Sequence, residues 1–229
     1  MFEDREAFDP GIDSKMLLKR TPFHLFFRGS VLLWKLVFSR HPQDALIWVR
    51  SMIARRRPLT MPIPWLTFDA IRFVSQFIQK DWKVFEYGSG HSTIYWLRKG
   101  LTIVAVEDNR EWKMYLQNTL SSTDKNRCEL IYAESTDDYI NSIEKFNKGE
   151  FDLILVDGSY RRECIRKSVD YLKRGGYLVV DNTDWHWFRE VPLDGIPAEW
   201  KKRVYPGYAP MLGHESETTI WQRPLSTES

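Results

Sequence analysis

The stretch over residues 83–93 constrains the fold of this chain more than any other. It reads KVFEYGSGHST, which is a short apolar strand, a glycine turn and the start of a helix. Gly88 permits a sharp turn, and Gly90 lets a ligand approach the backbone because glycine has no Cβ. This order of elements places backbone N–H groups at a helix N-terminus, where doubly wound α/β domains bind nucleotides. The stretch therefore predicts an α/β fold with a ligand site at this turn.

The spacing of the glycines narrows the choice of ligand. A dinucleotide site of the G-x-G-x-x-G type has a third glycine that lets helix and strand pack closely, and Thr93 occupies that position here. An acid, Glu86, precedes the first glycine by two positions, and Ser89 lies between the two glycines. Ser92 or Thr93 is expected to cap the following helix. The broken pattern disfavours an NAD-linked oxidoreductase, which stays an alternative.

A second strand is predicted over residues 101–107, with a helix over residues 109–120. The strand is apolar until it ends in Glu107, 19 positions after Gly88. One carboxylate can accept hydrogen bonds from both hydroxyls of a ribose, and nucleotide sites use an acid at this place. Glu107 is therefore a candidate ribose ligand, with Asp108 beside it. The alternative is that an acid here only favours the following helix N-terminus.

The third predicted strand, residues 129–132, leads to Glu134 and Ser135. Because parallel strands end at one edge of the sheet, both residues are expected beside an adenine that crosses the strand tips. The next helix starts at the same point. Capping of that helix by Ser135 or Thr136 is the alternative role.

The fourth strand is a second strong signal, because the apolar residues of 151–156 run directly into Asp157 and a glycine. Such a strand brings a carboxylate to the carboxyl edge of a buried parallel sheet. A helix is predicted over residues 160–173, ended by the glycine pair at 175 and 176. Its basic residues are expected to face water: Arg161, Arg162, Arg166, Lys167 and Lys173.

The fifth predicted strand, residues 177–181, ends in Asp181 and is followed by Asn182 and His186. Carboxylates and imidazoles serve as general bases, which makes these acids and His186 candidates for that role. For His186 a packing or surface role is the alternative. The aromatic stretch 185–213 is expected to shape a pocket for a sugar or planar ring, although aromatics that cover a core would give the same pattern.

Four motifs occur in register: EYGSG (86–90), VE (106–107), LVDG (155–158) and KRGGYLVVDN (173–182). In order and spacing they resemble class I S-adenosylmethionine-dependent methyltransferases, most closely small bacterial members whose substrates are mostly unassigned. The resemblance covers residues 64–223, including an expected last, antiparallel strand at 217–222. It implies an α/β fold with a doubly wound, mostly parallel seven-stranded sheet and an N-terminal helical extension.

The resemblance also implies an activity and a set of site residues. It points to methyl transfer from S-adenosylmethionine to a small-molecule or glycan acceptor, with O-methylation expected. Asp157, Asp181 or His186 would take the acceptor's proton. The implied cofactor-binding residues are Glu86, Gly88, Ser89, Gly90, Ser92, Glu107, Asp108, Glu134, Ser135 and Asp157. A non-catalytic domain that binds the nucleoside as a structural or regulatory ligand is the alternative from another class.

A narrower resemblance concerns a metal. Asp157, Asp181 and Asn182 look like the metal-binding triad of catechol- and caffeoyl-CoA-type O-methyltransferases, whose oxygen ligands suit Mg²⁺. That family usually has a lysine near the acid of the fourth strand, and this chain has GSY at residues 158–160 instead. A metal is therefore not favoured.

The first 60 residues are expected to form an arm and a helical extension, and residues 61–229 the methyltransferase domain. Residues 22–57 are apolar and aromatic, but Arg28 and Lys35 interrupt the run, which disfavours a membrane-spanning helix. A helical cap packed on the domain is favoured, and peripheral membrane contact is the alternative. Prolines at 58, 62 and 64 mark a linker, and a helix is predicted over residues 65–79.

Composition excludes some classes of protein. A net charge of +2 over 229 residues predicts no nucleic-acid partner. Cys128 and Cys164 have neither metal-site nor disulfide spacing and are expected in the core of a protein from a reducing compartment. An acidic start without a following apolar run predicts no signal peptide, so a cytoplasmic location is expected.

Overall fold

The computed structural model describes residues 22–54, 59–186, 188 and 193–225. Its elements, in chain order, are α2 (Pro22–Val37), α3 (Gln43–Ala54), α4 (Phe68–Phe77), β1 (Lys83–Tyr87), α5 (His91–Arg98), β2 (Thr102–Glu107), α6 (Arg110–Thr119), α7 (Ser122–Lys125), β3 (Cys128–Tyr132), α8 (Thr136–Asn141), a 3-10 helix (Ser142–Lys145), β4 (Phe151–Val156), α9 (Arg161–Ser168), β5 (Leu172–Asp181), β6 (Lys201–Tyr208) and β7 (Glu215–Gln222).

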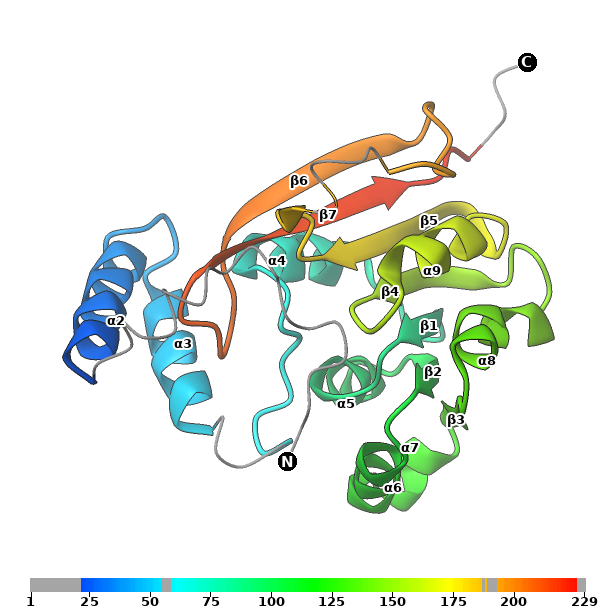
Figure 1. The fold of residues 1–229 in the computed structure, drawn as a ribbon, viewed down its shortest axis with the longest axis horizontal. Coiled ribbons are helices and arrows are strands. Elements are labelled where there is room, and N and C mark those ends of the chain that lie inside the picture. The colour runs from blue at the N-terminus through cyan, green and yellow to red at the C-terminus, as the bar shows by residue number, and fades with distance from the viewer. Residues whose placement is uncertain (1–21, 55–58, 187, 189–192, 226–229) are drawn as a thin grey trace.

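The strands form one seven-stranded sheet in the order β3-β2-β1-β4-β5-β7-β6 (Figure 1). Strands β1 to β5 pair in parallel, and β7 runs antiparallel between β5 and β6. The strand order reverses between β1 and β4, and such a switch point is where α/β sheets bind ligands. The predicted doubly wound, mostly parallel seven-stranded sheet is confirmed.

The central strands β1, β2 and β4 are buried on both faces, which explains their largely apolar sequences. In β4, Leu153 and Leu155 pack into one core with α4, α5 and α6, whereas Ile154 and Val156 pack into a second core with α8 and α9. Cys164 lies in the second core, and Cys128 packs at the edge of the first, as expected from the sequence. The helices thus form layers on both faces of the sheet.

The boundary between the fourth and fifth βα units differs from the prediction. α9 ends at Ser168 rather than at residue 173, and β5 already begins at Leu172 rather than at residue 177. The register of β4 against β5 shifts between the pairs Phe151–Leu172 and Leu153–Tyr177, so the glycine pair lies in an irregular strand and does not end a helix. A Cβ on Gly176 would lie 2.8 Å from the carbonyl oxygen of Asp152, so glycine is needed for this close approach.

β6 is a second difference, because its residues lie in the stretch predicted to shape a pocket. It pairs with β7 along its whole length and forms the edge of the sheet. Phe188 and Trp200 are buried in a core, and Tyr205 packs on Phe73 with ring centroids 5.4 Å apart. These aromatics cover the sheet, which is the alternative role given for them, and a pocket role for the rest of the stretch stays a prediction. Trp187 lies outside the described residues.

The helical extension packs on the domain through α3, which lies between α2 and the sheet (Figure 1). The indole Nε1 of Trp48 donates to the carbonyl of Leu212 over 2.8 Å, and Met211 N donates to Ser51 Oγ over 2.8 Å. A buried carboxylate, Asp44, accepts two hydrogen bonds from Arg72 Nη1 on α4, at 2.8 and 2.9 Å.

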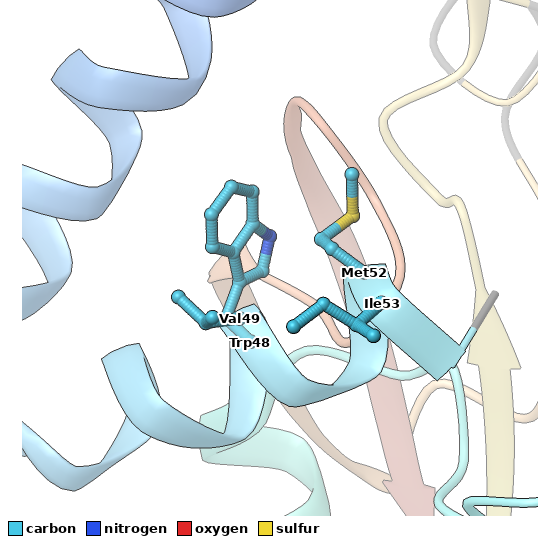
Figure 2. Close-up of a pocket in the computed structure, with 4 residues that line it drawn as sticks. All are labelled: Trp48, Val49, Met52 and Ile53. Carbon is cyan, nitrogen blue, oxygen red and sulfur yellow. The ribbon is translucent and has the colours of Figure 1, made fainter.

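The outer surface of the extension exposes several large apolar side chains among charged and polar ones. A hollow of about 380 Å³ lies beside α3. It is lined by the four residues labelled in Figure 2: Trp48, Val49, Met52 and Ile53. The exposed apolar residues of α2, α3 and their connection are Val31, Trp34, Val37, Phe38, Leu46 and Ile53. Within the described part of the chain, no helix is long and apolar enough to cross a membrane. Peripheral membrane contact stays a prediction, and residues 1–20 and 55–57 lie outside the described residues.

Candidate functional site

The glycine turn after β1 packs directly on the chain that follows β4. Gly88 has φ +94°, and a Cβ there would lie 3.0 Å from the Cα of Gly158. Its N–H donates to the carbonyl of Val106 in β2 over 3.0 Å. Glycine at 88 is therefore required both by its left-handed conformation and by the close approach of two backbones.

Thr93, at the third-glycine position of a dinucleotide site, links the glycine turn to Glu86 through hydrogen bonds. Its hydroxyl accepts from Gly90 N over 2.9 Å and donates to Glu86 Oε2 over 2.6 Å. The N-cap of α5 is Gly90, so neither Ser92 nor Thr93 is the N-cap residue. Thr93 is the third residue of the helix, and its hydroxyl accepts from the backbone N–H of Gly90. Glu86 has no exposed surface, which places it beneath the turn. Burial raises the pKa of Glu86 to about 7, and the hydrogen bond from Thr93 opposes this.

Glu86 should make stability depend on pH. Its pKa rises from the ordinary 4.5 to about 7, so the folded protein keeps this proton where the unfolded chain loses it. The stabilisation that Glu86 contributes to the folded protein is fully present below pH 4.5 and is lost as pH rises towards 7. Glu86→Gln keeps an acceptor for Thr93 and cannot ionise. Its stability relative to wild type should rise across this window by on the order of 3 kcal/mol.

Urea unfolding at several pH values measures this difference. Glu134→Gln, the same change at an exposed acid, is the matched control and should follow the wild type. Wild-type and Glu86→Gln stabilities that run parallel across the window would contradict the assignment.

Glu107, at the end of β2, binds the turn from the side. Its Oε2 accepts from Ser89 N at 3.2 Å and from Ser89 Oγ at 2.8 Å, and its Oε1 accepts from Asn109 N at 3.0 Å. Burial raises the pKa of Glu107, and the Ser89 hydroxyl opposes the shift. A carboxylate has about four acceptor sites, so the three bonds leave room for a further donor on Oε1.

Two further contacts complete this half of the site. The indole of Trp112, on α6, donates from Nε1 to Ser89 O over 2.7 Å and lies 3.7 Å from where a Cβ of Gly90 would be. Asp108 Oδ2 accepts from Ser159 Oγ over 2.9 Å, which joins the end of β2 to the loop after β4. Trp112 was not predicted from the sequence.

Ser135 caps α8, as one of its two predicted roles required. Its hydroxyl accepts from Asp138 N over 3.1 Å and donates to Asp138 Oδ2 over 2.7 Å. Glu134 and Ser135 are both exposed. Contact of either with an adenine stays a prediction.

The other half of the site lies between the ends of β4 and β5, and Arg161 is at its centre. The prediction that Arg161 faces water is wrong. Only 11% of its side chain is exposed. Arg162 is also largely covered, with 16% exposed and its guanidinium 5.8 Å from the ring of Phe188. Because α9 begins at Arg161, after a left-handed Tyr160 (φ +50°), this side chain turns towards the ends of β4 and β5.

The two predicted acids stand in different surroundings. Asp157 is 28% exposed and pairs with Arg161 at 3.2 Å. Asp181 is buried, and burial together with the nearby charge of Asp157 raises its pKa to about 8. Thr218 Oγ1 donates to Asp181 Oδ1 over 2.6 Å and accepts from Thr67 N over 3.1 Å.

The residues that resemble a metal triad, for which a metal was not favoured, are bonded to Arg161 instead. Asn182 Oδ1 accepts from Arg161 over 2.8 Å, and Asp157 Oδ1 accepts from the same guanidinium. In the described part of the chain, no cluster of three or more His, Cys, Asp or Glu residues is placed to hold a metal ion. His186 follows the end of β5 by five residues, where the backbone is helical, and its role as a base stays a prediction.

Comparison with known proteins supports the fold assignment. No protein-family model matches the chain, and no curated protein matches it in sequence. Among solved structures it is similar to an O-methyltransferase from Bacillus cereus in complex with S-adenosylhomocysteine, with a TM-score of 0.56 and 15% identity over 87% of this chain and 100% of that one. The chain has a methyltransferase fold.

A second methyltransferase agrees with this. An S-adenosylmethionine-dependent O-methyltransferase from Thermotoga maritima gives a TM-score of 0.51 and 14% identity over 78% of this chain and 73% of that one. At such identities the similarity establishes the methyltransferase fold, and the predicted resemblance is confirmed at that level.

Proposed function

We propose that the protein is an S-adenosylmethionine-dependent methyltransferase that acts on a small-molecule or glycan acceptor by O-methylation. The observation that carries the proposal is Glu107, which ends β2 beside the turn of Gly88 and Gly90 and keeps acceptor capacity on Oε1. A ribose hydroxyl can donate to that oxygen, while the turn lets a nucleoside approach the backbone at the start of α5.

The proposed chemistry requires little from the protein beyond position and proton transfer. The methyl group of the sulfonium cofactor is already activated, so the acceptor must be held in line with it and lose a proton. Asp157 is the best placed base, because it directly follows β4 next to Gly88 and is partly exposed. Asp181 is buried behind it and fits a supporting role better.

Two other functions fit the residues less well. An NAD-linked oxidoreductase is disfavoured because Thr93 fills the third-glycine position and is bonded to Glu86. A non-catalytic nucleoside-binding domain would need only the half of the site around Glu107. The proximity of Asp157 to that half favours an enzyme.

The cofactor assignment predicts selective stabilisation. S-adenosylmethionine and S-adenosylhomocysteine should raise the melting temperature, and NADH should not, because a ligand stabilises the native state that binds it. Glu107→Ala should weaken S-adenosylhomocysteine binding by about 1.5–3 kcal/mol, the range for hydrogen bonds to a charged group. Thermal shift and titration calorimetry measure both effects.

Glu111→Ala, which removes an exposed acid from the first turn of α6, is the control and should bind normally. Stabilisation by NADH alone would overturn the assignment.

To separate an enzyme from a binding module, the protein is incubated with methyl-labelled S-adenosylmethionine and extracts of small molecules and glycans. Tight cofactor binding without label transfer to any acceptor would favour the module.

A further inference from the structure

We propose that the guanidinium of Arg161 is a built-in cation that takes the place of a divalent metal between the ends of β4 and β5. The inference deepens the proposed function and rests on it, since it assigns this site to metal-independent methyl transfer. Arg161 acts as a positioning residue, and the strand ends that it joins carry both candidate acids, Asp157 and Asp181.

All five N–H groups of the guanidinium have a partner at these two strand ends. Nε donates to Gly158 O over 2.9 Å. Nη1 donates to Asp181 O over 2.6 Å and to Asn182 Oδ1 over 2.8 Å. Nη2 donates to Asp157 O over 2.8 Å and to Asp157 Oδ1 over 3.2 Å. The side chain thus binds five oxygens from both strand ends.

These oxygens are the kind that would hold Mg²⁺, which takes about six oxygen ligands in near-octahedral geometry. Two of them, on the side chains of Asp157 and Asn182, belong to the triad that the sequence suggested for a metal. A divalent cation on these two oxygens would lie next to the guanidinium, whose positive charge opposes its binding. Trp185 covers one side of it, with its ring 4.9 Å from the guanidinium carbon.

The backbone is shaped for this arrangement on both sides. Tyr160, just before Arg161, has φ +50°, and Asn182 has φ +56°. Non-glycine residues seldom adopt such angles, and they do so where the surrounding contacts over-determine them. Here the left-handed turns aim Arg161 and the Asn182 side chain at each other.

A consequence for the reaction follows from the hydrogen-bond count. With every donor used, Arg161 has none left for an acceptor molecule and so does not bind substrate directly. Instead it fixes Oδ1 of Asp157, which leaves Oδ2 as the oxygen that can face an acceptor. The positive charge also favours the ionised form of Asp157 and opposes the effect of burial on its pKa.

Manganese binding tests the proposal without knowledge of the acceptor. Mn²⁺ is titrated into the protein, with and without S-adenosylhomocysteine, and the electron paramagnetic resonance signal of the free ion is followed. Wild type and Arg161→Lys should leave the signal unchanged. Arg161→Ala frees Asp157 and Asn182, so the signal should fall, and the double variant Arg161→Ala/Asp157→Asn should restore it.

Each outcome decides the proposal. Uptake of Mn²⁺ by the wild type that Asp157→Asn abolishes would overturn it, and this comparison does not depend on the folding of any Arg161 variant. A folded Arg161→Ala protein that takes up no Mn²⁺ would overturn it too, because the guanidinium would then not be what keeps a cation out. Failure of S-adenosylhomocysteine to shift the melting temperature would count against the proposed function alone, since Mn²⁺ uptake is also read without it.

Discussion

Gly158→Ala is expected to destabilise the protein by about 3 kcal/mol or more, at the upper end of the cost of overpacking a core. A Cβ at this position would lie 2.1 Å from the Tyr139 hydroxyl and 2.9 Å from both Gly88 N and Tyr87 O. Tyr139 is buried and the other two atoms are backbone, so none of them can move aside cheaply. Urea unfolding measures the loss, and binding of S-adenosylhomocysteine should be lost with it because the turn at Gly88 is displaced.

Gly213→Ala is the control for this change. A Cβ on Gly213 would meet nothing within 4 Å, so its substitution should change the free energy of unfolding by less than about 0.5 kcal/mol. Equal stabilities for the two alanine variants would show that the ends of β1 and β4 do not approach each other as described.

Arg72→Met should cost about 3 kcal/mol, because it leaves a buried carboxylate on α3 without its charged partner. Asp44 is only 5% exposed, whereas Arg72 is 30% exposed, and the exposure of the arginine holds the expected loss at the low end of the range for buried pairs. The loss should appear first as detachment of α3 from α4. Hydrogen exchange over residues 43–54 would then speed up before the sheet unfolds.

A second acid that pairs with Arg72, the exposed Asp69, provides the control. Asp69 pairs with Arg72 at 2.6 Å but is 58% exposed, so Asp69→Asn should cost less than about 1 kcal/mol. Slow exchange in α3 of Arg72→Met, equal to that of Asp69→Asn, would mean that the apolar contacts of α3 hold it without the ion pair.

The parallel half of the sheet could be predicted because its signals are local. Each strand from β1 to β4 is a short apolar run, and β1, β2 and β4 deliver a glycine turn or an acid to the same edge. Those patterns follow from two-sided burial and from the ligand edge of a parallel sheet. The positions of Gly88, Glu107, Asp157 and Asp181 at strand ends follow from the same pattern.

Arg161 could not be predicted for a specific reason. It follows Asp157 by one helical turn, which is a visible signal, but a helix drawn over residues 160–173 places it with the exposed basic residues. The actual helix has eight residues and starts at Arg161, after Tyr160 in a left-handed conformation. A tyrosine in the sequence does not predict that conformation. β6 escaped notice for another reason, since its exposed edge carries lysines, a proline and a glycine, which are poor strand formers.

The hydroxyl of Thr218 fixes where a proton can reside on the buried acid of β5. A threonine hydroxyl has one hydrogen, which Thr218 donates to Oδ1 of Asp181 while its oxygen accepts from the N–H of Thr67. While Oδ1 accepts this hydrogen bond, it does not carry the carboxyl proton. Near neutral pH, where the raised pKa keeps the carboxyl largely neutral, its hydrogen sits on Oδ2. Asp181 then has a defined tautomer, and any exchange of its proton with the site passes through that single oxygen.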